Sequence, residues 1–243
     1  MSDITTAVRA DLIRGNRLVT ALNHGNPVLV QREPGGDVRG VSPALARELA
    51  RRLEVEPEWV HFDSAGKVFA ALPSGAWDVA FLAIDPARAA EIAFTAPYVV
   101  IEGSYVVPEG SALKAMDDVD RPGVRIAAGL NTAYDLYLTR TLEHAELVRA
   151  PTSAAALELF VTEGLDAAAG VRQPLMAFAR ARAGLRVIDG SFTKIQQAMG
   201  TPKSKPAGAA YLREFIEEMK ASGFVARALE ASGQRDASVA PPA

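Results

Sequence analysis

Short apolar runs alternate with helical patterns through almost the whole chain, and this rhythm limits the folds open to it. One helical stretch, ALARELARRL, places Leu45, Leu49 and Leu53 at helical spacing. The strand-like runs lie at 18–22, 58–62, 77–83, 124–128, 146–149, 165–169 and 185–188. Strands that alternate with helices in this way predict an α/β fold with a largely parallel sheet.

Capping residues indicate where several helices begin. Ser42-Pro43 reads as an N-cap followed by a proline at the first helical position. Thr132, with Asp135 three residues later, resembles a capping box. Near the end of the chain we expect an extended segment at 194–199 and two helices at 207–221 and 223–231. The last residues, ASVAPPA, have the composition of a tail.

The two rounds of alternation predict two lobes. We expect lobe 1 to comprise residues 1–105 and 190–243, and lobe 2 to comprise residues 106–189. The extended stretches 102–108 and 189–195 would then be paired crossovers. Open α/β sheets bind ligands at the carboxyl ends of their strands, so two such lobes predict a cleft that closes by a hinge motion.

Composition excludes several functions. The chain has 243 residues, no cysteine and a formal net charge of −3, with no run of five like charges, which argues against a nucleic-acid partner. Its three histidines, His24, His61 and His144, form no metal-binding pattern. Neither a Walker loop nor a dinucleotide fingerprint is present. We therefore expect no metal, no cofactor and no nucleic acid, and we expect a monomer.

Residues 78–98, DVAFLAIDPARAAEIAFTAPY, place a single arginine, Arg88, five residues after a strand. The guanidinium group can bind a carboxylate through two parallel hydrogen bonds. Arg88 is then either a carboxylate anchor in a ligand cleft or a surface charge on a short helix begun by Asp85-Pro86. Ile84, at the end of the same strand, is a candidate for lining the pocket.

Two further loops carry candidate ligand residues. Gly129-Leu130-Asn131-Thr132 joins a strand to a helix and could present free backbone N–H groups to an anion, or it could be an ordinary helix cap. Asn23, His24 and Asn26 follow the first strand and could line a pocket, or they could simply form a turn. We expect His61 and His144 to be structural or exposed.

Together these segments resemble the family 3 solute-binding proteins, the receptors of ABC importers for amino acids and related molecules. The resemblance covers residues 17–231. It rests on GVSPALARELARRLEVEPEWV, on AAGLNTAYDLYL, and above all on ALPSGAWDVAFLAIDPARAAEIAFTAPYVV, in which Leu-x-x-Gly-x-x-Asp precedes a strand, an arginine and a second strand ending in Pro-Tyr. It implies a two-lobed, periplasmic-binding-protein-like fold of type II, each lobe a mostly parallel sheet flanked by helices. It also implies that Arg88, Asn131 and Thr132 hold the carboxylate of the ligand.

Three departures from the family pattern bear on the ligand. The segment before Arg88 is about two residues shorter, and the aromatic usual in the first loop is replaced around 25–28. Where the family has its ammonium-binding acid, this chain has Val171-Arg172. Because a buried ammonium group without a partner is costly, we expect a carboxylate ligand without an α-amino group, or a ligand with two acidic ends that meet Arg88 and Arg172.

The location of the protein decides between a receptor and its alternatives. No signal peptide precedes the first helix, so the sequence as written predicts the cytoplasm, or the periplasm if a leader was removed. An exported receptor would meet the membrane subunits of an ABC importer. The alternatives are a cytoplasmic ligand sensor or an enzyme similar to cyclohexadienyl dehydratase, with Glu102 and His24 as acid-base candidates. We expect a binding protein and no catalysis.

Overall fold

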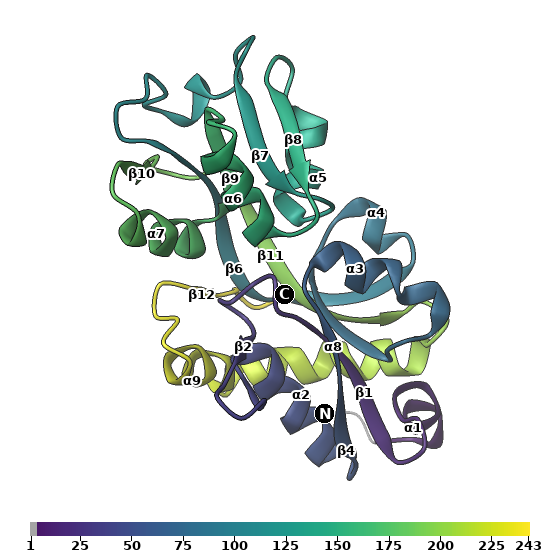
Figure 1. Ribbon diagram of the computed structural model, residues 1–243. Helices are drawn as coiled ribbons and strands as arrows, with labels where there is room; N and C mark the ends of the chain where they lie inside the picture. Colours follow the sequence, from purple (N-terminus) through teal and green to yellow (C-terminus); the bar gives the residue numbers. More distant parts are fainter. Residues whose placement is uncertain (1–3) are drawn as a thin grey trace. The chain divides into compact units, whose positions relative to one another are not determined.

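The computed structural model describes residues 4–243, and the chain divides into two compact units (Figure 1). Unit 1 comprises Met1–Val100 and Gln196–Ala243, and unit 2 comprises Ile101–Ile195. The chain therefore leaves unit 1 and returns to it once. The sequence predicted boundaries after residue 105 and before residue 190, and the structure places them after Val100 and before Gln196, inside two long strands. These strands are β6 (Ile92–Pro108) and β11 (Thr193–Pro202).

Unit 1 is built on a mixed sheet with strand order β4-β1-β5-β11-β6. Three of its strands are β1 (Arg17–Asn23), β4 (Glu56–Phe62) and β5 (Val79–Ala83). β1 pairs in parallel with both β4 and β5, and β11 pairs antiparallel with β5. The carboxyl ends of β1 and β5 consequently lie at the same edge of the sheet.

Apart from α1, which precedes β1, the helices of unit 1 fall in the segments between its strands, as the sequence pattern indicates. They are α1 (Thr6–Leu12), α2 (Val41–Arg52), α3 (Ala65–Ala70), the 3₁₀ helix η1 (Leu72–Ser74), α4 (Pro86–Ala89), α8 (Pro206–Ala221) and α9 (Phe224–Ala231). In α2, Leu45 and Leu49 are fully buried, and so is Leu53 at its C-cap. The leucine spacing therefore identified the face that α2 packs into the core.

The start of α2 differs from the expected cap. Gly40, not Ser42, is the N-cap residue, and the helix begins at Val41. The hydroxyl of Ser42 lies 3.0 Å from the phenol oxygen of Tyr98 on β6, and both side chains are buried. Ser42 therefore connects a helix to the sheet and does not cap the helix.

The aspartate of the Leu-x-x-Gly-x-x-Asp segment has a structural role. Asp78 directly precedes β5, and its side chain is 3% exposed. Its carboxylate accepts a hydrogen bond from Arg14 at 2.9 Å and forms an ion pair with Lys205. Arg14 follows α1 and Lys205 precedes α8, so one buried acid connects three segments that are distant in the sequence.

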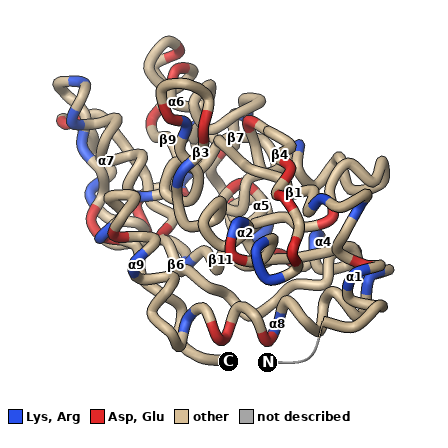
Figure 2. Tube along the Cα trace, turned by 90° about the horizontal axis from the view of Figure 1, so that it is seen from below, with Lys and Arg blue, Asp and Glu red and all other residues tan. Residues whose placement is uncertain are grey.

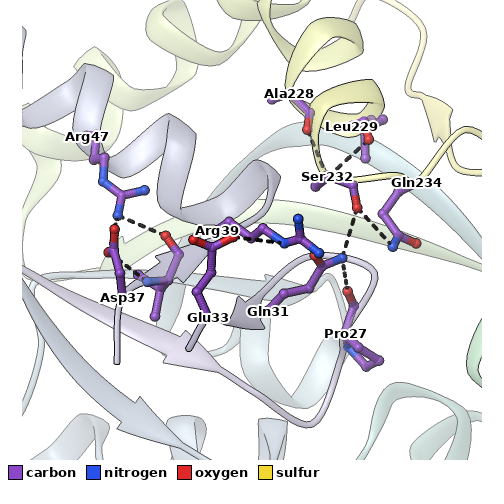
Figure 3. A network of polar contacts seen from close by, with 11 residues as sticks. Pro27, Gln31, Glu33, Asp37, Arg39, Arg47, Ala228, Leu229, Ser232 and Gln234 are labelled. Atoms are coloured by element: carbon purple, nitrogen blue, oxygen red, sulfur yellow. Dashed lines mark hydrogen bonds and ion pairs between the residues drawn. The ribbon is translucent and has the colours of Figure 1, made fainter. Parts of the chain in front are cut away.

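A small hairpin, β2 (Gln31–Arg32) and β3 (Val38–Arg39), is attached to two helices of unit 1 (Figure 3). The Gln31 amide donates hydrogen bonds to the carbonyl oxygens of Pro27 and Ser232, at 3.0 and 3.1 Å. On the other side, Arg47 of α2 donates to Asp37 at 2.9 Å. The loop after β1 is thus held to the C-terminal end of α9.

The last residues of the chain do not form the expected tail. β12 (Ser238–Val239) pairs antiparallel with β6 at Val99 and Val100. The backbone N–H of Ala240 donates to the Tyr98 carbonyl at 3.1 Å, and Lys220 donates to the Pro241 carbonyl at 2.8 Å. Proline and small residues suggested a tail, but an extended segment of this composition can also pair along a strand edge.

Unit 2 repeats the architecture around the strand order β6-β9-β7-β8. Its elements are the 3₁₀ helix η2 (Met116–Asp118), β7 (Arg125–Gly129), α5 (Ala133–Thr141), β8 (Glu146–Ala150), α6 (Ser153–Thr162), β9 (Ala167–Val171), α7 (Arg172–Ala181) and β10 (Leu185–Val187). β7 pairs in parallel with β8 and β9, whereas β6 pairs antiparallel with β9 and β10. Phe160 and Leu165 pack with alanines of β7 and β9 in its core.

Charges of both signs are interspersed along the chain (Figure 2). Within residues 4–243, no helix combines the length and the apolar character needed to cross a bilayer.

The parallel pairs in each unit, covered by helices, confirm the predicted α/β fold with a mostly parallel sheet.

Candidate functional site

Arg88 lies in a short helix that its own sequence specifies. β5 is buried throughout and is followed by Ile84 and by Asp85, which caps α4 by accepting the Ala87 N–H at 2.9 Å. Pro86 occupies the first helical position, where its missing N–H costs nothing. The short helix begun by Asp85-Pro86 is therefore present, as the interpretation of Arg88 as a surface charge on that helix assumed.

The Arg88 side chain is nevertheless not a surface charge. The residue is only 1% exposed, and its guanidinium donates a hydrogen bond to the Ala83 carbonyl at 3.1 Å. Burial lowers the pKa of Arg88, and the nearby Asp85 carboxylate partly opposes this shift, so that the resulting pKa is about 10. Arg88 remains a cation at neutral pH, so unit 1 contains a buried positive charge at the carboxyl end of β5.

In unit 2, the start of α5 is built as an internal cap. Thr132 is the N-cap residue, and its hydroxyl accepts the Asp135 N–H at 3.2 Å and donates to the Gly129 carbonyl at 2.8 Å. Asn131 adopts a positive φ of 57°, and its N–H donates to the Asp135 carboxylate at 2.8 Å. Asp135 therefore binds Asn131 and not the Thr132 N–H that an ideal capping box would use.

These bonds revise the expected anion site. The backbone N–H groups of Asn131, Thr132 and Asp135 all have acceptors within the chain, so the expectation of free N–H groups does not hold for them. Asp135 is itself a buried carboxylate, bound by Arg149 at 2.8 Å, and no local sequence pattern pairs the two residues. Ligand binding by Asn131 and Thr132 stays a prediction.

The loop after β1 uses its asparagines in turns. The Asn23 side chain accepts the Gly25 N–H at 3.0 Å, and the Asn26 side chain accepts the Val28 N–H at 3.3 Å. Such bonds from asparagine to the backbone two residues later stabilise turns. The turn alternative therefore explains both asparagines, and a role in ligand binding is a further prediction.

His24 makes a contact that the sequence pattern did not predict. Its Nε2 atom lies 2.8 Å from Nδ1 of His61, and its backbone N–H donates to the Phe62 carbonyl at 2.8 Å. Burial, the charge of Arg32 and the charge of His61 together lower the pKa of His24 to about 4, and burial contributes most. His61 is exposed, as expected, and its pKa is lowered as well.

The lowered pKa of His24 predicts a loss of stability in mild acid. Because the pKa of His24 is lower in the folded than in the unfolded state, folding releases protons between pH 6.5 and about 4. The stabilisation is present above pH 6.5 and is lost as the pH falls through this range. After allowance for solvent screening we expect a loss of about 1 to 2 kcal/mol. Urea unfolding at pH 7.5 and 4.5 measures it, and His24→Gln should reduce the difference while His144→Gln should not.

At the end of β9, Val171 is the N-cap residue of α7. The next residue, Arg172, donates hydrogen bonds to the carbonyl oxygens of Gly190 and Ile188, at 2.7 and 3.2 Å. Arg172 is the first residue of α7 and is half-buried. Its bonds fix the segment that follows β10 against α7.

The candidate residues gather at one sheet edge within each unit. In unit 1, Asn23, His24 and Asn26 follow β1, and Ile84 and Arg88 follow its parallel neighbour β5. In unit 2, Asn131 and Thr132 follow β7, and Arg172 follows its parallel neighbour β9. Carboxyl ends of parallel strands are the usual place for ligands in α/β sheets.

The two acid-base candidates, by contrast, belong to different units. His24 lies in unit 1, and the half-buried Glu102 lies on β6 within unit 2. Among residues 4–243, no three or more His, Cys, Asp and Glu side chains are grouped so that they could hold a metal ion.

The family model described as bacterial extracellular solute-binding proteins, family 3, matches residues 18–232. No curated protein is significantly similar to the chain in sequence.

Solved structures share the fold at low sequence identity. A mutant of ArgBP from T. maritima has a TM-score of 0.80 at 21% identity, over 94% of this chain and 99% of that one. An amino acid ABC transporter substrate-binding protein from Streptococcus pneumoniae, bound to L-arginine, has a TM-score of 0.79 at 20% identity, over 97% and 100%. An ancestral amino acid-binding protein, AncCDT-1, a precursor of cyclohexadienyl dehydratase, has a TM-score of 0.75 at 22% identity, over 89% and 94%.

Proposed function

Because the chain belongs to family 3 of the bacterial extracellular solute-binding proteins, we propose that it is the receptor of an ABC importer for a small carboxylate-bearing solute. The observation that carries the proposal is Arg88, a cation buried at the carboxyl end of β5 in the segment that resembles the family most closely. The planar donors of a guanidinium match the two oxygens of a carboxylate, and a cation at this position attracts the negative charge of such a ligand.

The remaining candidate residues have secondary roles in this proposal. In unit 2, Asn131 and Thr132 at the start of α5 and Arg172 at the start of α7 are proposed ligand-binding residues. In unit 1, the further proposed residues are Asn23, His24, Asn26 and Ile84.

The proposed ligand is not an ordinary α-amino acid. At the end of β9, Val171 offers no charge to an α-ammonium group, and its neighbour Arg172 is a cation. An ammonium group placed there would lose its hydration without gaining an acidic partner. Organic acids without an α-amino group, including those with two carboxylates, avoid this cost.

As an importer receptor, the protein meets its solute outside the cytoplasm and delivers it to membrane subunits. We therefore propose export of the chain and docking to an ABC importer. Solute-binding proteins of this architecture close around a ligand by hinge motion. The strands that continue from one unit into the other, β6 and β11, are the proposed hinges.

A thermal-shift screen against amino acids, hydroxy acids, keto acids, dicarboxylates and aromatic acids tests the function. Ligand at 100 times its dissociation constant adds about 2.7 kcal/mol of stability, which raises Tm by roughly 5 to 10 °C. We expect organic acids to raise Tm and amino acids to leave it unchanged. A shift with amino acids alone contradicts the proposed ligand class, and a panel without any hit contradicts the carboxylate site.

The screen also separates a receptor from the alternative enzyme. A receptor returns its ligand unchanged, whereas an enzyme similar to a dehydratase converts a stabilising acid into a product that accumulates. Analysis of each hit by mass spectrometry after prolonged incubation distinguishes the two. The likeness to AncCDT-1 motivates this control.

A further inference from the structure

We propose that Asp85 determines the specificity of the Arg88 site by accepting a hydrogen bond from a donor that the ligand carries beside its carboxylate. This inference rests on the proposed function, because it assumes that Arg88 anchors a ligand carboxylate. It assigns a role to the one acidic side chain that α4 places on the same turn as Arg88.

The geometry of α4 brings the two groups together. Asp85 is the N-cap residue and Arg88 is the third residue of the helix, and residues three apart occupy the same face of a helix. Both are buried, Asp85 at 3% and Arg88 at 1% exposure. The Asp85 carboxylate also acts on Arg88 electrostatically, since it raises the pKa that burial lowers.

Hydrogen bonding determines which ligands the pair accepts. We expect a carboxylate bound to Arg88 to bring the neighbouring substituent of the ligand towards the Asp85 oxygens. A buried acceptor that loses water without gaining a donor is costly, so a ligand with a donor at this position is favoured. A ligand with acceptors only would instead face the Asp85 oxygens with its own lone pairs.

These requirements describe a chemical class. A 2-hydroxy acid carries its carboxylate and a hydroxyl donor on adjacent carbons, whereas the corresponding 2-keto acid has only an acceptor at that position. At the end of β9, Val171 provides no side-chain acceptor. Asp85 is therefore the acidic acceptor that unit 1 places beside its anchor, and 2-hydroxy acids should be preferred over 2-keto acids.

Calorimetric titration with matched ligand pairs tests the inference. The pairs are lactate and pyruvate, 2-hydroxyglutarate and 2-ketoglutarate, and phenyllactate and phenylpyruvate. Wild-type protein should bind at least one hydroxy acid about ten-fold or more tightly than its keto partner, because sites built to accept a hydrogen bond reject analogues without the donor. In Asp85→Asn the ratio should fall below about three-fold, since the amide can donate to the keto oxygen.

Matched variants separate specificity from folding. Asparagine keeps an acceptor for the Ala87 N–H, and Asp85→Ser offers a second capping residue without charge, so both variants should fold. Asp63→Asn removes the charge of an exposed aspartate that pairs with Lys67, also in unit 1, and should leave the ratio unchanged.

The outcomes distinguish this inference from the proposed function. Equal binding of hydroxy and keto acids by wild type, or an unchanged ratio in Asp85→Asn, overturns the role of Asp85 and leaves Arg88 as anchor. Unchanged binding in Arg88→Ala, or no binding by any acid, overturns the proposed function and this inference with it. A preference for an amino acid that Asp85→Asn abolishes supports Asp85 as acceptor, because ammonium is also a donor, and contradicts only the exclusion of α-amino acids.

Discussion

Replacing Arg88 with alanine is expected to weaken ligand binding by about 30-fold or more. Removing one partner of a desolvated, hydrogen-bonded charge pair costs about 2 to 5 kcal/mol, and 1.4 kcal/mol corresponds to ten-fold in affinity. Arg88→Lys keeps the charge but loses the planar set of donors, so it should fall between alanine and wild type. Calorimetric titration with the acid that gives the largest thermal shift measures all three proteins.

The alanine variant should also be less stable, because it leaves the Asp85 carboxylate buried without the nearby cation. The cost of such a change is about 3 to 5 kcal/mol for a fully buried pair. Arg52→Met controls for stability. Arg52 of α2, 11% exposed, forms ion pairs with Glu48 and Glu218, so its loss should lower Tm without changing affinity. If Arg88→Ala and Arg52→Met bind the ligand with equal affinity, Arg88 has a purely structural role.

The fold could be predicted because strand and helix periods are local properties of the sequence. Apolar runs identified β5 and β7, and the leucines of α2 identified its buried face. The C-terminal residues show where local pattern stops being informative. Whether Ser238 and Val239 form a strand depends on an unpaired edge of β6 about 140 residues earlier, and a partner at that distance leaves no periodic signal.

The sequence could predict where the candidate site residues lie along the chain, but it could predict few of the contacts that they make. Arg88 stood out because it follows a strand in a recognisable segment, but its burial depends on how α4 packs. The pairing of His24 with His61 could not be read from either residue, because it requires β1 and β4 to be neighbours with Leu22 opposite His61. In unit 2, the contact of Asp135 with Arg149 likewise depends on where α5 lies against β8.

Gly40→Ala is expected to cause the largest loss of stability of any single methyl group added to this chain. Gly40 has a φ of 120° and a ψ of 173°, a region that is essentially restricted to glycine. A Cβ atom there would lie 2.2 Å from the Leu29 carbonyl oxygen and 2.8 Å from its carbonyl carbon. Because both are backbone atoms, relief requires movement of the loop after β1 or of the start of α2.

Strain in φ/ψ and this collision together should destabilise the protein by about 3 to 5 kcal/mol, which lowers Tm by roughly 6 to 20 °C. Two glycines separate the contributions. Gly36 has a φ of 91°, and no atom lies within 4 Å of a Cβ added there. Gly36→Ala should therefore lower the free energy of unfolding by the backbone strain alone, about 1 to 2 kcal/mol. Gly110→Ala introduces neither a positive φ nor a collision and should change stability by less than about 0.5 kcal/mol.

Melting curves that give Gly40→Ala the same Tm as Gly36→Ala would show that the loop moves to accommodate the methyl group. The close approach of Leu29 to Gly40 would then not be required for the fold. Loss well beyond the strain alone would show that this approach fixes the loop that carries His24 and Asn26.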